Sequence, residues 1–365
     1  MSEAQATSEA ERPRRDGVIR RVINAIGLDN VSLIFALAIL IVVIVSRQPL
    51  FLTWQNLMNS LAQSIVIVGL MAIGQTIVIV GGGLDISVGS TASVASVTSA
   101  IAVVFGVAGI LPPGIMQLGL LVGILTGMTL GLINGLVVTV LRVNPIIATL
   151  GTLAAYAGLA FLIAPDGRPV GVITQPDFTW LGTGRILADL PVPRLGGPWT
   201  GIPVLFVILV IVAILAHILM RYTDFGRSVY AIGGNATAAR LGGINLRRSR
   251  LVMYSISGMC AGLAGVLLTA RTTSGNPING VGFELQAITA VFLGGAATTG
   301  GKGTIIATVL AFILVGTLNN GMNLIGIGTF YQRVALGLLL IGAVAITQWR
   351  QQRAERARTR LASAG

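Results

Sequence analysis

The chain has 365 residues, of which only 10% are charged and 54% are hydrophobic, and its mean hydropathy is +0.88. Because soluble chains carry about 25% charged residues, this composition excludes an ordinary soluble protein and indicates that the excess apolar surface faces lipid. The net charge of +12 comes from basic residues at the ends of apolar segments, and aromatic residues make up only 5%, so membrane topology explains it better than nucleic-acid binding.

The amino-terminal segment, residues 1–30, is a polar, basic tail that precedes an uncharged apolar run from Val31 to Val45. Ser46-Arg47-Gln48-Pro49 follows this run, where a signal peptide would have a small-residue cleavage site. The run therefore predicts a retained first transmembrane helix, and we expect the tail to stay in the cytoplasm.

Further apolar segments follow, so the sequence predicts an all-α, polytopic membrane bundle of about ten transmembrane helices in a single domain, residues 31–349. The segments cover about 61–80, 86–105, 115–141, 146–164, 202–220, 251–270, 285–297, 304–318 and 334–347. Several are shorter than the roughly 20 residues that cross a bilayer core of about 30 Å, above all the segment after Glu284. We expect these to be tilted, discontinuous or shielded by protein.

The positions of the arginines predict the orientation, because Lys and Arg are retained on the cytoplasmic side. Arginines crowd the loop of about 221–250 and the basic tail of 350–365, so we expect both regions and both chain termini to be cytoplasmic. The stretch of about 165–200 is rich in Pro, contains Trp180 and Trp199, and is too polar to span. It is predicted to be an external loop, either with an interfacial segment or as a solvated connector.

The stretch from Gly81 to Ser90 interrupts two apolar segments with three glycines and the carboxylate of Asp85. Non-helical backbone at membrane depth is stable only where protein covers it or where it lines a wet cavity, and a carboxylate there is usually functional. Asp85 and Ser87 are therefore candidates for a translocation path or gate. The alternative is that Asp85 caps a helix beginning at Ile86. The phosphate-loop Lys-Ser or Lys-Thr does not follow, which argues against nucleotide binding.

A second glycine-rich interruption runs from Gly294 to Thr304 and is predicted to break a helix. Its Lys302 is followed by Gly, so it lacks the hydroxyl residue that would hold magnesium in a phosphate loop. Glu284 begins the preceding short segment and is a further candidate for the translocation path or gate, since it could point into a cavity or cap that helix. The sequence leaves both interpretations open.

Amides lie within or beside apolar segments, where each costs free energy unless it meets another polar group. They are Asn134, Asn144, Asn319, Asn320 and Asn323. An amide offers a donor and an acceptor together, which suits a neutral polyhydroxyl solute, so four of them are candidates for the translocation path: Asn134, Asn319, Asn320 and Asn323. Interhelical hydrogen bonding is the alternative use.

Glycine is abundant, at 48 residues, which in lipid lets helix backbones approach closely. The sequence from Gly131 to Gly135 is similar to the sequence from Gly316 to Gly321. These stretches lie on the fourth and ninth predicted helices, which run in opposite directions. This is either an inverted repeat of the transporter kind or a chance similarity. His217 and Cys260 lack partners at metal-ligand spacing, so no metal site is predicted.

The loop from Gly233 to Gly243 predicts a short helix, with Asn235 as its N-cap and Gly242 as its left-handed stop. Such a helix between two spans suits docking onto a cytosolic partner. The alternative is an interfacial helix on anionic lipid. The candidate contact residues are Asn235, Ala238, Ala239, Arg240, Leu241 and Gly242.

At this loop and the two glycine breaks, the chain resembles the membrane permease subunit of bacterial ABC importers for monosaccharides, the ribose-type branch. The matching stretches are 83–90, 230–235, 238–241, 243–244, 293–295, 300–303 and 318–324, in the order that the family has them. The similarity covers the chain from Leu33 to Ile346, and the basic tails at both ends look longer than the family requires.

The resemblance implies a homodimeric, cobalamin-importer-like permease with ten helices per subunit in the bacterial inner membrane. The implied partners are ABC ATP-binding subunits, a periplasmic or lipid-anchored sugar-binding protein and a second permease copy. ATP and magnesium would then belong to the partner ATPase, so this chain is expected to be no enzyme and to need no cofactor. The helix that docks into the ATPase maps onto Asn235 to Gly242.

The expected function is therefore ATP-driven import of a ribose-like or other simple sugar. An ion-coupled secondary transporter is the rival, weakened because only Asp85 and Glu284 lie near apolar segments. An ABC permease for a nucleoside or an inositol is a further alternative. A membrane-embedded enzyme ranks last, because no nucleophile and base pair or metal set is visible.

Overall fold

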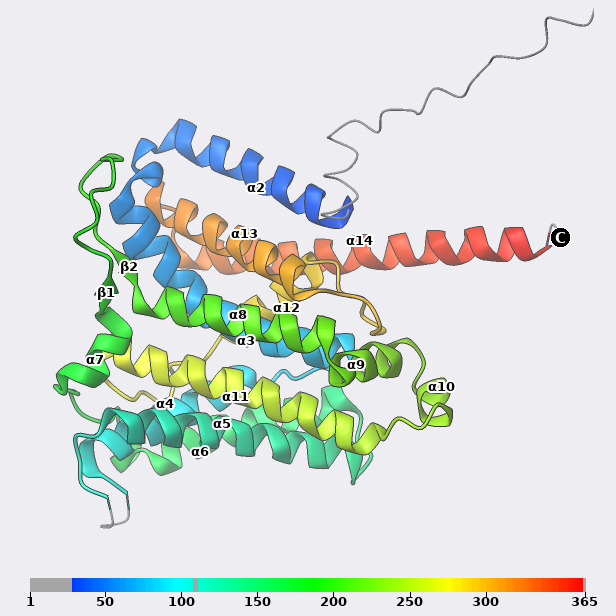
Figure 1. Ribbon diagram of the computed structural model, residues 1–365, viewed down its shortest axis with the longest axis horizontal. Coiled ribbons are helices and arrows are strands. Elements are labelled where there is room, and N and C mark those ends of the chain that lie inside the picture. The colour runs from blue at the N-terminus through cyan, green and yellow to red at the C-terminus, as the bar shows by residue number, and fades with distance from the viewer. Residues whose placement is uncertain (1–27, 108–110, 364–365) are drawn as a thin grey trace, which may run out of the picture.

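The computed structural model describes the backbone of residues 28–107 and 111–363, and the side chains of the described residues from 30 to 349. Most of the basic tail predicted over residues 1–30 therefore lies outside the described residues. The long helices lie roughly side by side in one bundle (Figure 1).

The elements follow one another in this order: α2 (Leu28–Arg47), η1 (Pro49–Leu52), η2 (Asn56–Leu61), α3 (Ala62–Val80), α4 (Val88–Phe105), α5 (Met116–Thr139), α6 (Pro145–Ile163), η3 (Pro165–Gly167), α7 (Pro176–Thr183), β1 (Arg185–Ile186), β2 (Ile202–Pro203), α8 (Val204–Tyr222), α9 (Asp224–Gly234), α10 (Ala236–Leu241), α11 (Leu246–Thr272), α12 (Phe283–Leu293), α13 (Ile305–Leu324) and α14 (Thr329–Ser363). The two strands form a short antiparallel ribbon. Helix α10 lies at one end of the bundle and α7 with the ribbon at the other, and we call these the α10 end and the α7 end (Figure 1).

Each predicted apolar segment forms a helix. Within the described residues, nine helices are long and apolar enough to cross a membrane. The tenth, α12, has 11 residues and is about 17 Å long at 1.5 Å per residue, roughly half of a bilayer core. The prediction of a polytopic helical membrane protein with a discontinuous segment after Glu284 is confirmed.

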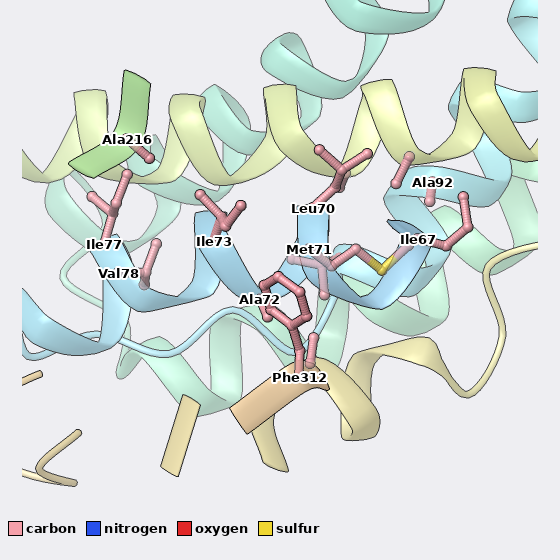
Figure 2. Close-up of a cluster of buried hydrophobic side chains, with 14 of the residues drawn as sticks. Ile67, Leu70, Met71, Ala72, Ile73, Ile77, Val78, Ala92, Ala216 and Phe312 are labelled. Carbon is pink, nitrogen blue, oxygen red and sulfur yellow. The ribbon is translucent and has the colours of Figure 1, made fainter. Parts of the chain in front are cut away.

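Burial follows position in the bundle. Helix α3 is buried along almost its whole length, whereas α2 and the apolar part of α14 are largely exposed. Figure 2 shows side chains of α3, among them Leu70 and Ile73, between neighbours that include Ala92 of α4, Ala216 of α8 and Phe312 of α13. The exposed helices carry apolar side chains outward, as a lipid-facing surface requires.

Helices α5 and α11 pack along a seam of glycines spaced four residues apart. Gly123, Gly127 and Gly131 of α5 face Gly258 and Gly262 of α11. A Cβ added at Gly127 would lie 2.3 Å from the carbonyl oxygen of Gly258, so the backbones touch. This is the small-residue packing that lets helices associate in lipid without a hydrophobic driving force.

Two non-helical stretches cross part of the bundle, residues 81–87 before α4 and residues 273–282 before α12. The second stretch runs beside α4, where the backbone N–H of Gly280 donates to Ser93 Oγ (2.9 Å) and Asn279 Nδ2 donates to Ser96 Oγ (2.9 Å). Gly280 also touches the backbone of Gly89, so α4 and α12 begin next to each other inside the protein. These contacts shield backbone that lipid could not solvate.

The two halves of the chain repeat one order of elements in opposite directions. A long helix, a non-helical stretch and a second helix occur as α3, 81–87 and α4, and again as α11, 273–282 and α12, although α4 has 18 residues and α12 only 11. Helix α3 ends at the α10 end, whereas α11 begins there (Figure 1). Helices α5 and α13, which contain the two similar glycine- and asparagine-rich sequences, also run in opposite directions. This arrangement favours the inverted repeat over chance similarity.

Three boundaries differ from the sequence prediction. Helix α4 begins at Val88 and not at Ile86, because Asp85 accepts from the backbone N–H of Ser87 and holds these residues in a turn. The backbone of α14 stays helical to Ser363, across the boundary predicted between residues 349 and 350. The stretch of about 165–200 contains the helix α7 and strand β1, and Phe178 of α7 is buried against the bundle.

Candidate coupling helix and polar sites

Asp85 is the centre of a buried polar cluster. Its side chain is only 1% exposed, and its Oδ1 accepts from the backbone N–H of Ser87 (3.1 Å), from Ser87 Oγ (2.7 Å) and from Asn134 Nδ2 (3.2 Å). Ser257 Oγ of α11 donates to Oδ2 (3.4 Å), and Gln75 Nε2 of α3 donates to the Asp85 carbonyl. The predicted path residues Asp85, Ser87 and Asn134 are therefore brought together.

Two tyrosines extend this cluster. Tyr156 OH of α6 donates to Asn134 Oδ1 (3.1 Å), and Tyr254 OH of α11 donates to the carbonyl of Leu84 (3.3 Å). Asp85 thus joins α3, α5 and α11 through hydrogen bonds, and Tyr156 adds α6 through Asn134. The hydrogen bonds to the Asp85 carboxyl group all come from donors, so both of its oxygens are satisfied as acceptors.

The predicted cap role of Asp85 needs a correction in register. The carboxylate accepts from the N–H of Ser87, the residue before the first helical residue of α4, and not from an amide inside a helix starting at Ile86. It closes the turn that leads into α4. A role for Asp85 in the translocation path stays a prediction.

Glu284 lies at the start of α12. Both carboxylate oxygens accept from the backbone N–H of Gly282, at 3.1 and 3.0 Å, so the side chain holds the turn that begins its own helix. The carboxylate also lies against Gly89, where an added Cβ would meet it. Of the two interpretations that the sequence left open, the geometry favours the cap.

A cavity of about 360 Å³ opens between α12, α13 and α14. Its polar lining consists of Gln286, Thr289, Asn319, Thr329, Gln332 and Arg333. Asn319 Nδ2 donates to Gln286 Oε1 (3.4 Å), while Asn319 Oδ1 is buried without a hydrogen-bond partner among the described residues. We call this the amide cavity. Its side chains offer the mixed donors and acceptors that a polyhydroxyl solute needs.

The three predicted asparagines of α13 differ in their surroundings. Asn319 lines the amide cavity, whereas Asn320 is buried and exchanges two hydrogen bonds with Asn56, at 2.9 and 3.0 Å. Asn323 accepts from Gln332 Nε2 (2.7 Å). The Asn320 amide therefore serves interhelical hydrogen bonding, the alternative use that the sequence left open.

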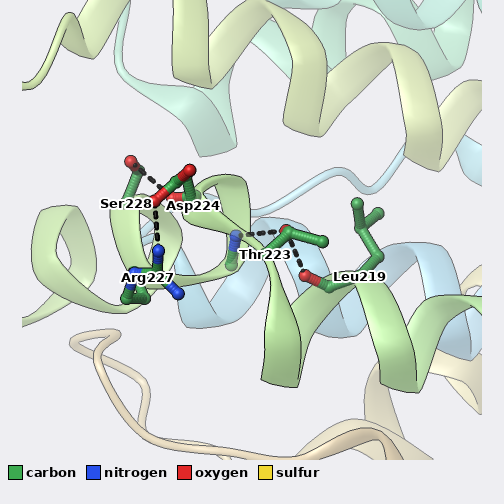
Figure 3. A network of polar contacts seen from close by, with 6 residues as sticks. Leu219, Thr223, Asp224, Arg227 and Ser228 are labelled. Carbon is green, nitrogen blue, oxygen red and sulfur yellow. Dashed lines mark hydrogen bonds and ion pairs between the residues drawn. The ribbon is translucent and has the colours of Figure 1, made fainter.

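The loop between α8 and α11 forms two helices at the α10 end. Thr223 Oγ1 accepts from Gly226 N (3.2 Å) and donates to Leu219 O (2.6 Å), so one side chain ends α8 and begins α9, as Figure 3 shows. In the next turn Arg227 forms an ion pair with Asp224, and Ser228 Oγ donates to the Asp224 carbonyl (2.9 Å) (Figure 3). These bonds fix the angle between the two helices.

Helix α10 begins as predicted, because Asn235 Oδ1 accepts from Ala238 N (3.0 Å). Its predicted stop is wrong by one residue. Gly242 has φ −77°, and Gly243, with φ 86°, is the residue in the left-handed region. The N–H of Ile244 then reaches the Ala239 carbonyl (3.0 Å), which closes the C-terminus.

The predicted contact residues of α10 face different surroundings. Leu241 is 85% exposed, Ala239 is buried, and Arg240 lines a cavity toward the bundle. Leu241 is therefore the apolar side chain that α10 presents outward. A single exposed leucine does not by itself identify an interface, so docking of α10 onto a partner stays a prediction.

Glycines of three loops meet directly before α10, and we call this the glycine junction. Gly82 follows α3, Gly233 ends α9, and Gly300 and Gly301 lie between α12 and α13. Gly301 N donates to the carbonyl of Val80 (2.8 Å), and a Cβ at Gly233 would lie 1.8 Å from the same oxygen. The loop between α8 and α11 is thus in backbone contact with the stretch that leads to Asp85.

Tyr230 of α9 ties the junction to the loop before α13. Its OH donates to the carbonyl of Gly303 (2.8 Å). Burial raises the pKa of Tyr230, and the nearby Arg221 acts in the opposite direction. The phenol therefore stays protonated at neutral pH and keeps this hydrogen bond.

The sequence analysis missed several residues of these sites. Gln75, Tyr156, Tyr254 and Ser257 complete the Asp85 cluster, and Gln286 and Gln332 line the amide cavity. The sequence signal that could have identified them is a polar side chain inside an apolar segment. Such a side chain is a candidate site residue whatever its type, and not only when it is an asparagine.

Comparisons with known proteins agree with this architecture. Residues 56–344 match the family described as "Branched-chain amino acid transport system / permease component". The chain is 37% identical to the ribose import permease protein of Bacillus subtilis strain 168 over 347 residues, 95% of this chain and 98% of that protein.

Two further relatives come from Escherichia coli strain K12. The chain is 35% identical to its D-allose transport system permease protein, over 87% of this chain and 91% of that protein. It is 33% identical to its L-arabinose transport system permease protein, over 89% and 92%. No solved structure matches the chain. The match over most of its length and the extent of these similarities show that the chain belongs to the family of transport-system membrane permeases.

Proposed function

We propose that this permease is the membrane subunit of an ATP-driven importer for a monosaccharide. The three relatives described above carry ribose, allose or arabinose in their names, which supports a simple sugar as the solute. The amide cavity, with its donors and acceptors and few charges, suits such a neutral solute. A nucleoside or an inositol shares this hydroxyl chemistry and is the second candidate class.

The observation that carries the ATP-driven mechanism is the form of α10. It is a short helix with a side-chain cap, it presents Leu241 to the outside, and its preceding residues are part of the glycine junction. We propose that a separate ATP-binding subunit binds α10, and that its movement reaches the Asp85 stretch through this backbone contact. ATP and magnesium belong to that subunit, and the chain itself is no enzyme.

We further propose that a second copy of the chain covers the amide cavity. Amides and a guanidinium group on an outward face cannot be left against hydrocarbon, so protein or water must cover them. The rim is apolar, with Val281 and Leu285 both more than half exposed. A substrate-binding protein would then deliver the solute at the α7 end, which we place outside the cell.

Leu241→Asp tests the coupling assignment. It places a charge in the proposed apolar contact, so we expect the ATP-binding subunit to be lost on co-purification while the unfolding temperature of the permease is unchanged. The matched control is Val172→Asp, an exposed apolar residue of the 165–200 loop, which should retain the ATPase. Retention of the ATPase by Leu241→Asp would exclude α10 as the docking helix.

Transport in proteoliposomes separates the ATP-driven mechanism from its rival. Uptake of radiolabelled ribose should require the ATP-binding subunit, the sugar-binding protein and ATP. An ion-coupled transporter would instead continue without them and stop when the ion gradient is dissipated.

A further inference from the structure

A larger cavity, of about 590 Å³, lies at the α10 end, separate from the amide cavity. Four segments line it: the 81–83 stretch, the α5–α6 connection, α10 and the first turns of α11. Each of the last three contributes arginine. The arginines are Arg142, Arg240, Arg247 and Arg250. We call this the arginine cavity.

The arginine cavity has no negative side chain to balance these four charges. Its lining residues include no Asp or Glu. Within the described part of the chain, none of the four guanidinium groups forms an ion pair or a hydrogen bond, whereas Arg227 nearby is paired with Asp224. What distinguishes the cavity is that four such guanidinium groups line one concave site.

Helix ends do not compensate this charge. Helices α3 and α5 end at the cavity and present carbonyl oxygens, while α6 and α11 begin there and present N–H groups. Their dipoles oppose each other pairwise, so the guanidinium groups determine the sign of the potential. Like charges in one concave site repel each other, and a bound anion would remove that cost.

The chemistry of the lining identifies the anion. A planar guanidinium donates two parallel hydrogen bonds to phosphate oxygens, and several arginines around one site match a group with three or more such oxygens. We propose that the arginine cavity binds a phosphate group, either that of an anionic lipid headgroup or a free phosphate.

The surroundings favour the lipid as the source. Leu141, Ile146 and Ile147 adjoin the cavity on the α5–α6 side and point outward, with exposed fractions of 68%, 47% and 65%. Acyl chains can lie on such apolar side chains while the headgroup reaches the arginines. Basic pockets between transmembrane helices on the cytoplasmic side are known to hold anionic headgroups in this way.

A bound phosphate would connect two parts of the molecule, because Arg240 belongs to α10 and Arg142 to the α5–α6 connection. A phosphate that bridges these two guanidinium groups ties the docking helix to the bundle. Membrane composition would then change how firmly α10 is held, independently of the solute and of the ATPase.

The test uses the full chain without its partners, so it does not depend on the proposed function. The unfolding temperature is measured in nanodiscs of phosphatidylcholine with and without phosphatidylglycerol, and in detergent with added sodium phosphate at constant ionic strength. We expect stabilisation by phosphatidylglycerol, and native mass spectrometry should show the lipid retained on the protein. Arg142→Gln with Arg247→Gln should weaken its retention by about tenfold or more.

The matched control is Arg221→Gln with Arg248→Gln, which removes two positive charges from the α10 end but none from the arginine cavity. It should retain the lipid, and circular dichroism should show both variants equally helical. Stabilisation by sodium phosphate alone would assign the site to free phosphate. Equal loss of retention in both double variants, or no stabilisation by either probe, would overturn the proposal.

Discussion

Gly233 brings the backbone of the loop between α8 and α11 against the end of α3. Its Cα lies against the carbonyl of Val80, while Gly234, the next residue, has open space where a Cβ would be. Two neighbouring glycines at the end of α9 therefore have different reasons to be glycine. Gly233 must be glycine because its backbone contacts the Val80 carbonyl, whereas no such contact requires glycine at position 234.

Gly233→Ala should consequently destabilise the protein, because a methyl group 1.8 Å from the Val80 oxygen forces two backbones apart. The cost of such overpacking is about 1–3 kcal/mol, and the hydrogen bond from Gly301 to Val80 would be strained as well. Thermal unfolding followed by tryptophan fluorescence measures it. Gly234→Ala is the control, and equal unfolding temperatures for the two variants would contradict the junction.

Asp85→Asn probes the polar cluster. The amide has one acceptor where the carboxylate has two, and its NH₂ group would face the hydroxyl or amide donors of Ser87, Asn134 or Ser257. Since unsatisfied buried groups cost about 1–3 kcal/mol each, we expect a lower unfolding temperature.

The same variant separates two roles for Asp85. A loss of sugar uptake at an unchanged unfolding temperature would indicate contact with the solute and contradict a structural role. Asp177→Asn, at an exposed position of α7, is the control and should change neither quantity.

Some site residues could be predicted from the sequence and others could not. Asn235 was identified because capping depends only on the next three residues, and the left-handed stop was missed by one because two glycines follow Leu241. The partners of Asp85 come from helices up to 172 positions away, so local pattern could mark the carboxylate but not its surroundings.

At the scale of elements, helices α5 and α11 show most clearly how glycine positions determine helix packing. Their glycine seam places backbone on backbone over several turns, so the pair depends on the absence of side chains and not on apolar fit. The glycines of α6 differ, because Gly151 and Gly158 have nothing within reach of an added Cβ.

Gly127→Val should separate α5 from α11, since its Cβ alone would lie 2.3 Å from the Gly258 carbonyl and the two γ-carbons have no space. We expect a strong loss of folded protein in size-exclusion profiles from detergent extracts. Gly158→Val changes helix propensity and size equally on α6 and should be tolerated. Similar losses for both variants would mean that the seam does not carry the packing.

Elements were predicted well where lipid imposes length and polarity. Each apolar segment corresponds to a helix, because a spanning helix needs about 20 apolar residues and leaves a long signal. The short elements α9, β1 and β2 were not predicted. Their polar or two-residue sequences carry no periodicity, and α9 is stabilised by Thr223 and by its packing on α8.

At the scale of the molecule, the orientation across the membrane is the central expectation. The chain offers a direct test, since its single cysteine, Cys260, is buried and should not react with a thiol reagent. Leu241→Cys at the α10 end and Leu187→Cys at the α7 end would place exposed thiols at opposite ends of the bundle.

A membrane-impermeant maleimide should label Leu187→Cys in intact spheroplasts, and Leu241→Cys only after the membrane is opened. The unmodified chain measures the background from Cys260. Labelling of Leu241→Cys in intact spheroplasts would reverse the proposed topology and with it the docking of a cytosolic ATPase on α10.

The overall architecture was predictable because composition alone excluded a soluble fold and the arginine distribution gave a consistent set of crossings. Which helices pack against each other could not be predicted from the sequence. Which helix contacts which depends on glycine positions in two distant segments, as between α5 and α11, and no single segment contains that information.

The adjacent starts of α4 and α12 divide the bundle at one depth. Each helix follows a non-helical stretch, and the stretch before α12 is held against α4 by hydroxyl and amide side chains such as Ser93 and Asn279. At this level the backbone N–H of Gly280 bonds to a hydroxyl side chain of α4 and not to a helical carbonyl. The interior of the bundle therefore contains a layer in which individual side chains, and not helical turns, satisfy part of the backbone.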